Sequence, residues 1–206
     1  MLEYVIEGHD GSAKTPVSLG VKKRLENMSY SVGLYAPFQI VNAQIPEVDI
    51  YLYWKKDETT SKALTLLSDV IKSNREDAIK NNVDVVLYDR HWLTILGEID
   101  HRENFKWNDF KPTFFLEAPV SKTMDCKRFS FDIPWTDSVD TIDSYYHKYL
   151  GLIEKYSEHV IDRYRVNTRT QPLDPIIDSI TDYIVTDLTN GHNSSQKGLQ
   201  IKGEKK

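Results

Sequence analysis

The chain has 206 residues, of which 40% are hydrophobic and 28% charged, and it carries a net charge of −5 at pH 7. Length and composition are typical of one globular α/β domain, and they exclude fibrous and membrane-spanning proteins because no apolar run is long enough to cross a bilayer. The negative charge disfavours nucleic acid as a partner. We expect a cytoplasmic protein, because the single cysteine, Cys126, cannot form an internal disulfide and the first strand begins too early to leave room for a signal peptide.

The first predicted element is a strand, Tyr4–Ile6, that runs into a glycine-rich turn and then a helix. Gly8, Lys14 and Thr15 have the spacing of a phosphate-binding loop, G-x-x-x-x-G-K-[ST]. In such a loop the backbone N–H groups surround an anion, the lysine neutralises phosphate, and the hydroxyl holds Mg²⁺. Ala13 replaces the second glycine, and the loop tolerates this methyl group provided that φ at Ala13 is negative. The alternative is an ordinary glycine-rich turn.

The motif predicts a nucleotide site built by the whole turn. The expected nucleotide-binding residues are Gly8, His9, Asp10, Gly11, Ser12, Ala13, Lys14 and Thr15. Apolar residues from Val17 to Leu25 indicate a helix directly after the turn, and Pro16 is tolerated because the first helical turn leaves its N–H groups unpaired. The positive end of this helix then points at the bound anion.

A strand, an irregular segment and a long helix follow. Ser31–Tyr35 is predicted to be a short strand, and Gln39–Tyr53 to be irregular with a short helix after Pro46. From Thr59 to Asn82, apolar residues recur at helical spacing and predict a long helix.

A nearly continuous apolar run, Val83–Tyr88, predicts a strand buried on both faces of a parallel sheet. It ends at Asp89, where open α/β sheets bind ligands. A carboxylate at this place in phosphate-loop proteins organises Mg²⁺ or its water. The alternative role for Asp89 is to cap the helix that follows.

The remaining segments continue the alternation of strands and helices. Their predicted order is a strand at Thr113–Glu117, a helix at Val120–Phe129, a flap over 129–141, a helix at Val139–Ser157, a strand within Val160–Asn167 and a helix from Pro172 or Asp174 to Leu188. This alternation predicts a three-layer α/β fold of the P-loop NTPase type, with a five-stranded parallel sheet flanked by helices. We expect a single domain at 1–188 and a disordered polar tail at 189–206.

In this order the chain resembles the thymidylate kinase family of P-loop nucleoside monophosphate kinases. The loop G-x-D-G-x-A-K-T is close to that family's G-x-D-G-x-G-K-[ST]. VVLYDRH at 85–91 is similar to its strand ending in Asp-Arg-Tyr. TFFLEAPVSKTMDCKR at 113–128 resembles a later strand and helix of the family, and HKYLGLIEKYSEHVID at 147–162 resembles its helix before the last strand.

The resemblance implies a role for each matched position, with ATP and Mg²⁺ as cofactors. Lys14 would bridge the donor phosphates, while Thr15 and Asp89 would hold the metal. Asp10 would face the acceptor sugar, and Arg90 would bind phosphate between donor and acceptor. The other implied residues are Arg128 at the base of the flap, which the family calls the lid, and Asn167, Thr168 and Arg169 beside the adenine. Related enzymes are typically dimers, so the resemblance leaves a homodimer open.

The sequence departs from the family where the acceptor phosphate binds. Ala36-Pro37-Phe38 stands in place of Arg-Glu-Pro, and the family's Asp-Arg on the long helix reads Asp69-Val70, with Arg75 more than a turn later. The lid contains acidic residues and no basic one, so a transition-state arginine would have to come from elsewhere. The candidates are Arg102, Arg163, Arg165 and Arg169, and for each of them a solvated surface position is the alternative.

Aromatic residues around the predicted cleft suggest an acceptor pocket, because flat side chains stack on a base. They are Phe38, Tyr51, Tyr53, Trp54, His91 and Trp92, and core packing is the alternative for each. We expect Phe38, Trp54, Arg75, Arg90 and His91, together with Asp10, to contact the acceptor.

Three functions remain open from the sequence. The first is transfer of the γ-phosphoryl group of ATP to a nucleotide or nucleoside acceptor. The second is a nucleotide-binding protein that has lost efficient transfer and acts through partners. The third is a kinase acting on a base or hydroxyl group in nucleic acid.

Overall fold

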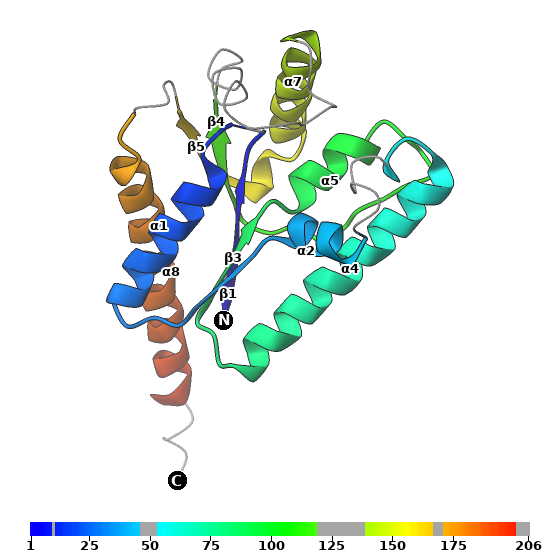
Figure 1. Cartoon of the computed structure of the whole chain (residues 1–206). Coiled ribbons are helices and arrows are strands. Elements are labelled where there is room, and N and C mark those ends of the chain that lie inside the picture. The colour runs from blue at the N-terminus through cyan, green and yellow to red at the C-terminus, as the bar shows by residue number, and fades with distance from the viewer. Residues whose placement is uncertain (10, 46–52, 119–138, 167–170, 201–206) are drawn as a thin grey trace.

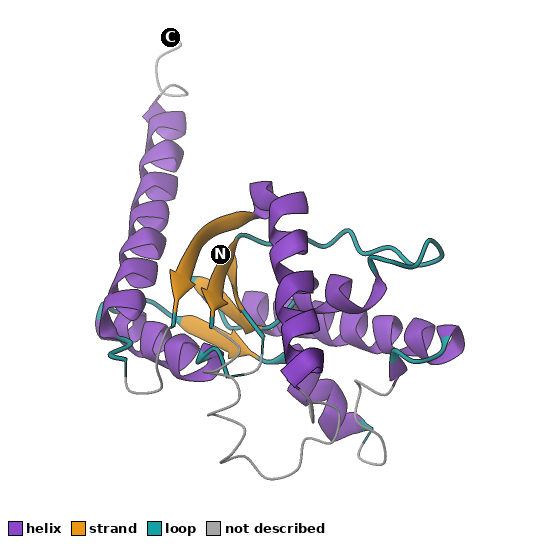
Figure 2. Cartoon of the chain, turned by 90° about the horizontal axis from the view of Figure 1, so that it is seen from above, coloured by secondary structure: helices purple, strands orange, loops and turns teal. Residues whose placement is uncertain are grey.

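The computed structural model describes residues 1–9, 11–45, 53–118, 139–166 and 171–200 (Figure 1). Its centre is a five-stranded parallel sheet with the strand order β2-β3-β1-β4-β5. The strands are β1 (Leu2–Glu7), β2 (Val32–Tyr35), β3 (Val85–Asp89), β4 (Thr113–Glu117) and β5 (Val160–Arg165). Figure 2 shows this sheet between helices on both sides. The predicted fold class is therefore confirmed.

One face of the sheet is covered by α1 (Lys14–Asn27) and α8 (Asp174–Gln200), which pack against each other. Alternate strand residues such as Tyr4, Ile6 and Leu87 point into this layer, as the two-residue period of a strand requires. Gly20 lets the two helices approach closely, because a Cβ there would lie 2.4 Å from the side chain of Ile177.

The opposite face is covered by α2 (Pro37–Gln44), α4 (Asp57–Lys80), α5 (Trp92–Ile99) and α7 (Val139–Lys155). Val5, Val86, Tyr88 and Phe115 point into this layer and form its core with residues of these helices. A short 3₁₀ turn, Ser157–His159, joins α7 to β5. The central strands β3, β1 and β4 are therefore covered on both faces, which explains their nearly continuous apolar sequences.

The structure differs from the sequence-based expectations in one segment. A helix, α2, occupies Pro37–Gln44 and overlaps the segment from Gln39 that was expected to be irregular; it begins at Pro37 because a proline fits the first helical position. Helix α8 ends at Gln200.

Several expectations lie outside the described residues. They are the short helix after Pro46, the helix at Val120–Phe129 and the flap up to residue 138, whereas the last flap residues, 139–141, belong to α7. The division of the chain into a domain at 1–188 and a tail therefore stays a prediction. In the described part of the chain, no helix is long and apolar enough to cross a membrane.

Candidate phosphate-binding site

The turn after β1 has backbone angles that favour glycine at two positions. Gly8 and Gly11 have positive φ angles of 151° and 78°, which residues with a Cβ atom rarely adopt. A Cβ at Gly8 would lie 2.4 Å from the carbonyl oxygen of Leu116 and 2.5 Å from Ser12 Oγ. Glycine is therefore required at this position by space as well as by backbone angle.

Ala13 corrects one expectation from the sequence. Its φ of 67° and ψ of 27° place it in the left-handed region, whereas a negative φ was expected to make the alanine tolerable. The loop thus keeps the backbone that the missing second glycine would adopt, and an L-residue there is strained by about 1–2 kcal/mol. Helix α1 begins directly afterwards, and its first hydrogen bond runs from the Val17 N–H to the Ala13 carbonyl at 3.1 Å.

Two buried side chains close the loop. Lys14 Nζ donates to the carbonyl of His9 at 2.9 Å, so the lysine lies back across the turn. The ring of His9 donates from Nε2 to the carbonyl of Ala118 at 2.6 Å and packs edge-on against Tyr146. The Oγ of Ser12 is fully buried and has no hydrogen-bond partner in the described structure. The loop is therefore fixed to the neighbouring strand β4 and retains an unsatisfied hydroxyl.

Thr15 and Asp89 meet across the two central strands. Ile6 of β1 is paired with Asp89 of β3, and Thr15 Oγ1 donates to Asp89 Oδ2 at 2.7 Å. A hydroxyl and a carboxylate at the N-terminus of a helix are oxygen ligands of the kind that Mg²⁺ takes, so this pair fits the predicted metal site. Asp89 does not cap α5, because α5 begins at Trp92 and its N-cap residue is His91. The capping alternative is therefore wrong.

Arg90 follows Asp89 in a strained conformation. Its φ is 71°, in the left-handed region that non-glycine residues avoid. Its N–H donates to the carbonyl of Ile6 at 3.2 Å, and its Nη1 donates to Thr94 Oγ1 at 3.3 Å. Strained backbone of this kind is found where function needs a side chain in one place. The corner thus holds the guanidinium at the start of α5, beside Thr94.

Glu7 is a residue of this site that the sequence analysis missed. Its buried carboxylate accepts hydrogen bonds from the N–H of His91 at 2.7 Å, the N–H of Thr94 at 3.1 Å and Thr94 Oγ1 at 2.9 Å. Glu7 lies between the last apolar residue of β1 and Gly8, and it fastens the corner that carries Arg90. The only signal in the sequence was a carboxylate at the end of an otherwise apolar strand, immediately before the glycine.

A second carboxylate, Glu117, lies at the end of β4. It accepts hydrogen bonds from the hydroxyl of Tyr146 at 2.7 Å and from Arg163 Nη2 at 2.8 Å, and Arg165 lies 3.8 Å away. Burial raises the pKa of Glu117, but the bonds from Tyr146 and Arg163 outweigh it and hold this pKa below the usual value. Glu117 is therefore ionised and engages two of the four arginines considered for the transition state.

The other predicted acceptor contacts lie away from the turn. Phe38 and Trp54 are in the core between the sheet and its helices, so the packing alternative describes them better. The ring of His91 is fully buried. Arg75 pairs with Glu3 at 3.0 Å, near the start of β1. Glu3 and Gly8 are about 16 Å apart along the strand, so this position does not fit a contact with an acceptor at the turn.

Of the remaining predicted site residues, five lie outside the described residues and Arg102 makes hydrogen bonds to other parts of the fold. Asp10, Arg128, Asn167, Thr168 and Arg169 lie outside the described residues. Arg102, a third candidate for the transition state, donates to Thr60 Oγ1 and to the carbonyl of Trp54, which indicates a structural role. In the described part of the chain, no three His, Cys, Asp or Glu side chains are close enough together to hold a metal by themselves.

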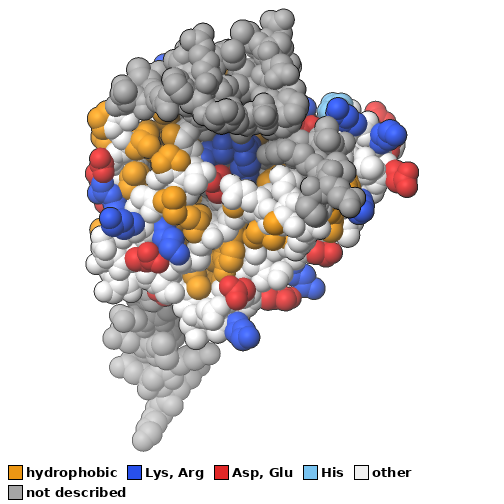
Figure 3. Space-filling model, in the orientation of Figure 1, with side chains coloured by type: hydrophobic (Ala, Val, Ile, Leu, Met, Phe, Trp, Pro, Cys, Tyr) orange, Lys and Arg blue, Asp and Glu red, His pale blue; other side chains and the backbone are white. Residues whose placement is uncertain are grey.

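The turn, Asp89 and Arg90 together lie at the carboxyl end of the two central strands, where P-loop proteins bind phosphate. In Figure 3, Lys and Arg side chains gather in the middle of the face at the end of the sheet where β1 leads into α1. Such a concentration of positive charge, with the N-terminus of α1, suits a polyphosphate.

Comparisons with known proteins agree with this fold. No protein-family model matches the chain, and no curated protein matches it. Among solved structures, the chain is similar to a deoxyadenosine kinase from M. mycoides with the products dCMP and a flexible dCDP bound. The TM-score is 0.59 at 14% sequence identity, and the match covers 90% of this chain and 100% of that one. The chain therefore has the fold of the P-loop nucleoside kinases.

Proposed function

We propose that the protein transfers the γ-phosphoryl group of ATP, with Mg²⁺, to a nucleoside or nucleotide. The observation that carries this proposal is the hydrogen bond between Thr15 and Asp89 beside the turn that Lys14 closes. These groups supply the three functions that phosphoryl transfer needs from a protein: a cradle for the phosphates, a metal site and a neutralising cation.

The residues of the site act by positioning and by charge. The backbone of the turn and the ammonium of Lys14 would hold the β- and γ-phosphates, while Thr15 Oγ1 and a carboxylate oxygen of Asp89 would hold Mg²⁺, which offsets charge on the leaving phosphate. The guanidinium of Arg90 would bind the transferring group. Glu7 would keep this guanidinium in place through the N–H groups of His91 and Thr94.

A nucleoside is the favoured acceptor. A monophosphate would need a positive clamp at the acceptor phosphate, and the residues after β2 are Ala36-Pro37-Phe38. Arg75, the single arginine of α4, is paired with Glu3, near the start of β1. A nucleoside needs no such clamp, and the similar solved structure is a nucleoside kinase. Thymidylate as the acceptor stays an expectation of the sequence resemblance.

The test is a panel of nucleosides and their monophosphates with ATP and Mg²⁺, read by the formation of ADP and of phosphorylated acceptor. We expect nucleosides to be phosphorylated faster than monophosphates. Thymidine monophosphate as the best substrate would contradict the preference for nucleosides. ATP binding without transfer to any acceptor would instead support a nucleotide-binding protein that acts through partners.

Two substitutions link the activity to the site. Lys14→Ala should lower turnover by at least about a hundredfold, since it removes charge that stabilises the transition state, while Lys23→Ala on the exposed side of α1 serves as the matched control. Asp89→Asn should weaken the dependence on Mg²⁺ more than it weakens folding. Equal losses of stability and activity in Asp89→Asn would contradict a role in metal binding.

A further inference from the structure

A pocket of about 560 Å³ lies between helix α4 and the segment 106–111 that leads into β4. Its walls come from Leu64, Ile71 and Arg75 of α4 on one side and from Lys106 and Trp107 on the other. This volume is within the range of about 300–1,000 Å³ that small-molecule sites occupy. None of the residues assigned above to the phosphates or the metal lines it.

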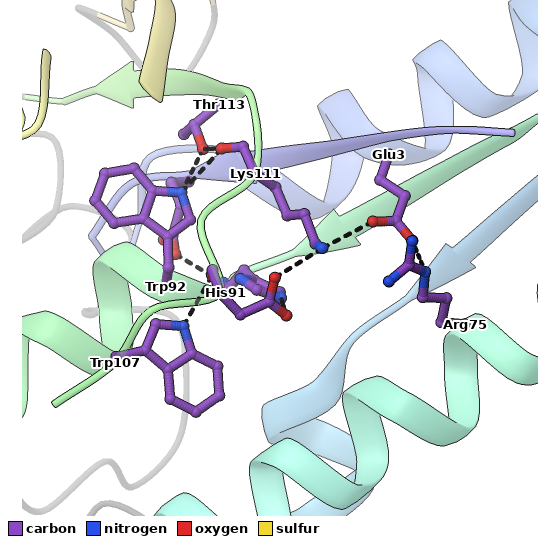
Figure 4. Close-up of polar contacts among 9 residues, drawn as sticks. Glu3, Arg75, His91, Trp92, Trp107, Lys111 and Thr113 are labelled. Carbon is purple, nitrogen blue, oxygen red and sulfur yellow. Dashed lines mark hydrogen bonds and ion pairs between the residues drawn. The ribbon is translucent and has the colours of Figure 1, made fainter. Parts of the chain in front are cut away.

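The pocket is separated from the phosphate-binding turn by the sheet. Tyr88 lines the pocket, and Asp89, the next residue of β3, contacts Thr15. Successive side chains of a strand point to opposite faces, so the pocket and the proposed metal site lie on opposite faces of β3. Arg75, which lines the pocket, forms an ion pair with Glu3 (Figure 4), and this also places the pocket near the start of β1.

Tyr88, which lines the pocket, carries an unsatisfied hydroxyl. The residue is fully buried, and its Oη has no hydrogen-bond partner among the described residues. Burial, followed by the carboxylates of Glu3 and Asp109, raises the pKa of Tyr88, so the hydroxyl keeps its proton and remains a donor. A buried donor without a partner destabilises a protein by about 1–3 kcal/mol. A ligand with an acceptor group would remove this loss.

The walls of the pocket are positively charged. Its lining contains four cations and two carboxylates: Lys72, Arg75, Lys106, Lys111, Asp69 and Asp109. Lys111 is occupied, since its Nζ lies 2.8 Å from Glu3 and 2.7 Å from Asp109 (Figure 4). Lys106 is exposed and makes no ion pair within the described structure. Glu3 also pairs with Arg75, so Lys106 is the cation of this lining that favours a small anion.

The pocket also offers a flat apolar surface. The indole of Trp107 is held by a hydrogen bond from Nε1 to the carbonyl of Asp109 at 2.9 Å, and Leu64 and Ile71 face it from α4. Figure 4 shows Trp107 beside His91, below Lys111. A held aromatic ring opposite aliphatic side chains is suited to a planar ring of a ligand.

We propose that this pocket is a second binding site, for a small organic anion that carries a flat ring. The ring lies between Trp107 and the aliphatic side chains of α4. The anionic group lies at Lys106, and an acceptor atom of the ligand receives the hydrogen bond of Tyr88. The site is separate from the nucleotide and its acceptor.

The test uses phenyl phosphate as the probe, with phenol and inorganic phosphate as probes that lack one of its two parts. Binding is followed through the side-chain N–H signal of Trp107 in NMR spectra of ¹⁵N-labelled full-length protein, identified with Trp107→Phe. We expect phenyl phosphate to saturate this signal at a Kd below about 1 mM, since small ligands can reach such affinity. Phenol and phosphate should each bind at least about tenfold more weakly.

Matched variants assign the binding to the pocket. Tyr88→Phe should weaken phenyl phosphate by about tenfold without loss of stability, because it removes a hydroxyl that has no partner. Tyr35→Phe is the control: its ring lies 6.2 Å from that of Tyr88, but its hydroxyl already donates to Asp77 and does not line the pocket. It should leave binding unchanged. Lys106→Gln should weaken binding two- to threefold, and Lys23→Gln on α1 should not.

Three results would overturn the proposal. One is unchanged binding in both Tyr88→Phe and Lys106→Gln. Another is loss of binding in Lys14→Ala, which would place the probe at the phosphate-binding turn. The third is equal binding of phenol and phenyl phosphate, since the proposed ligand is an anion.

Discussion

Replacing Ala13 with glycine should stabilise the protein, although the same change destabilises an ordinary helix. The φ of 67° at Ala13 is strained by about 1–2 kcal/mol for an L-residue. Glycine removes this strain but gains about 0.4–1 kcal/mol of conformational freedom in the unfolded chain. The methyl group also packs partly against the core under α1, and its loss offsets some of the gain. The net expectation for Ala13→Gly is about 0.5 kcal/mol of added stability.

The assay is thermal and urea unfolding of Ala13→Gly beside a matched control, Ala43→Gly. Ala43 is an exposed residue in α2, where glycine should destabilise by about 0.5–1 kcal/mol. The two variants carry the same chemical change and should therefore move the free energy of unfolding in opposite directions, with melting temperatures that differ by about 3–5 °C. If Ala13→Gly destabilises as much as Ala43→Gly, the left-handed conformation of the turn is refuted.

Three further predictions concern the corner after β3. Arg90→Gly should keep or raise the free energy of unfolding, because the φ of 71° at this position suits glycine, and it should lower turnover by at least about tenfold. In urea unfolding Arg90→Ala should be less stable than Arg90→Gly, and equal stability of the two variants would contradict backbone strain at Arg90. Glu7→Gln should destabilise by about 1–3 kcal/mol in the same assay, because an amide cannot accept all the bonds that the carboxylate accepts from His91 and Thr94. Burial lowers the pKa of His91 to about 4, so the unfolded chain binds a proton at this side chain between pH 6.5 and 4 while the folded one does not. The free energy of unfolding should therefore fall by up to about 3 kcal/mol as pH falls through this window. His91→Leu should remove that part of the loss, and identical pH profiles of stability for the wild-type protein and His91→Leu would contradict the lowered pKa of His91.

The fold followed from the sequence because periodicity reports burial. Val85–Tyr88 is apolar on both faces, and only a strand covered on both sides buries it fully, which the observed β3 confirms. The spacing of Gly8, Lys14 and Thr15 fixed the turn, since a strand, a turn and a helix with that spacing leave little choice of backbone. The pairing of Ile6 with Asp89 then brings the carboxylate to Thr15.

Features that depend on tertiary contacts did not follow from the sequence. The φ of Ala13 is set by the closure of the turn and not by the residue, so the negative φ that was the condition for tolerating alanine is not found. Arg75 was expected at the acceptor because of its place in the helix pattern, but the direction of α4 carries it to Glu3. The role of Glu7 appears only once β1 and the start of α5 lie side by side.

The hydrogen bonds of His9 and Glu7 have a consequence for motion. His9 ties the turn to the residue after β4, and Glu7 and Ile6 tie β1 to the corner after β3. Three neighbouring strands therefore share one rigid platform at their carboxyl ends. A nucleotide that binds there meets groups already in place, so little ordering entropy opposes binding on this half of the site. Any conformational step in the catalytic cycle would then belong to parts of the chain that approach the platform, and the platform itself would remain stationary.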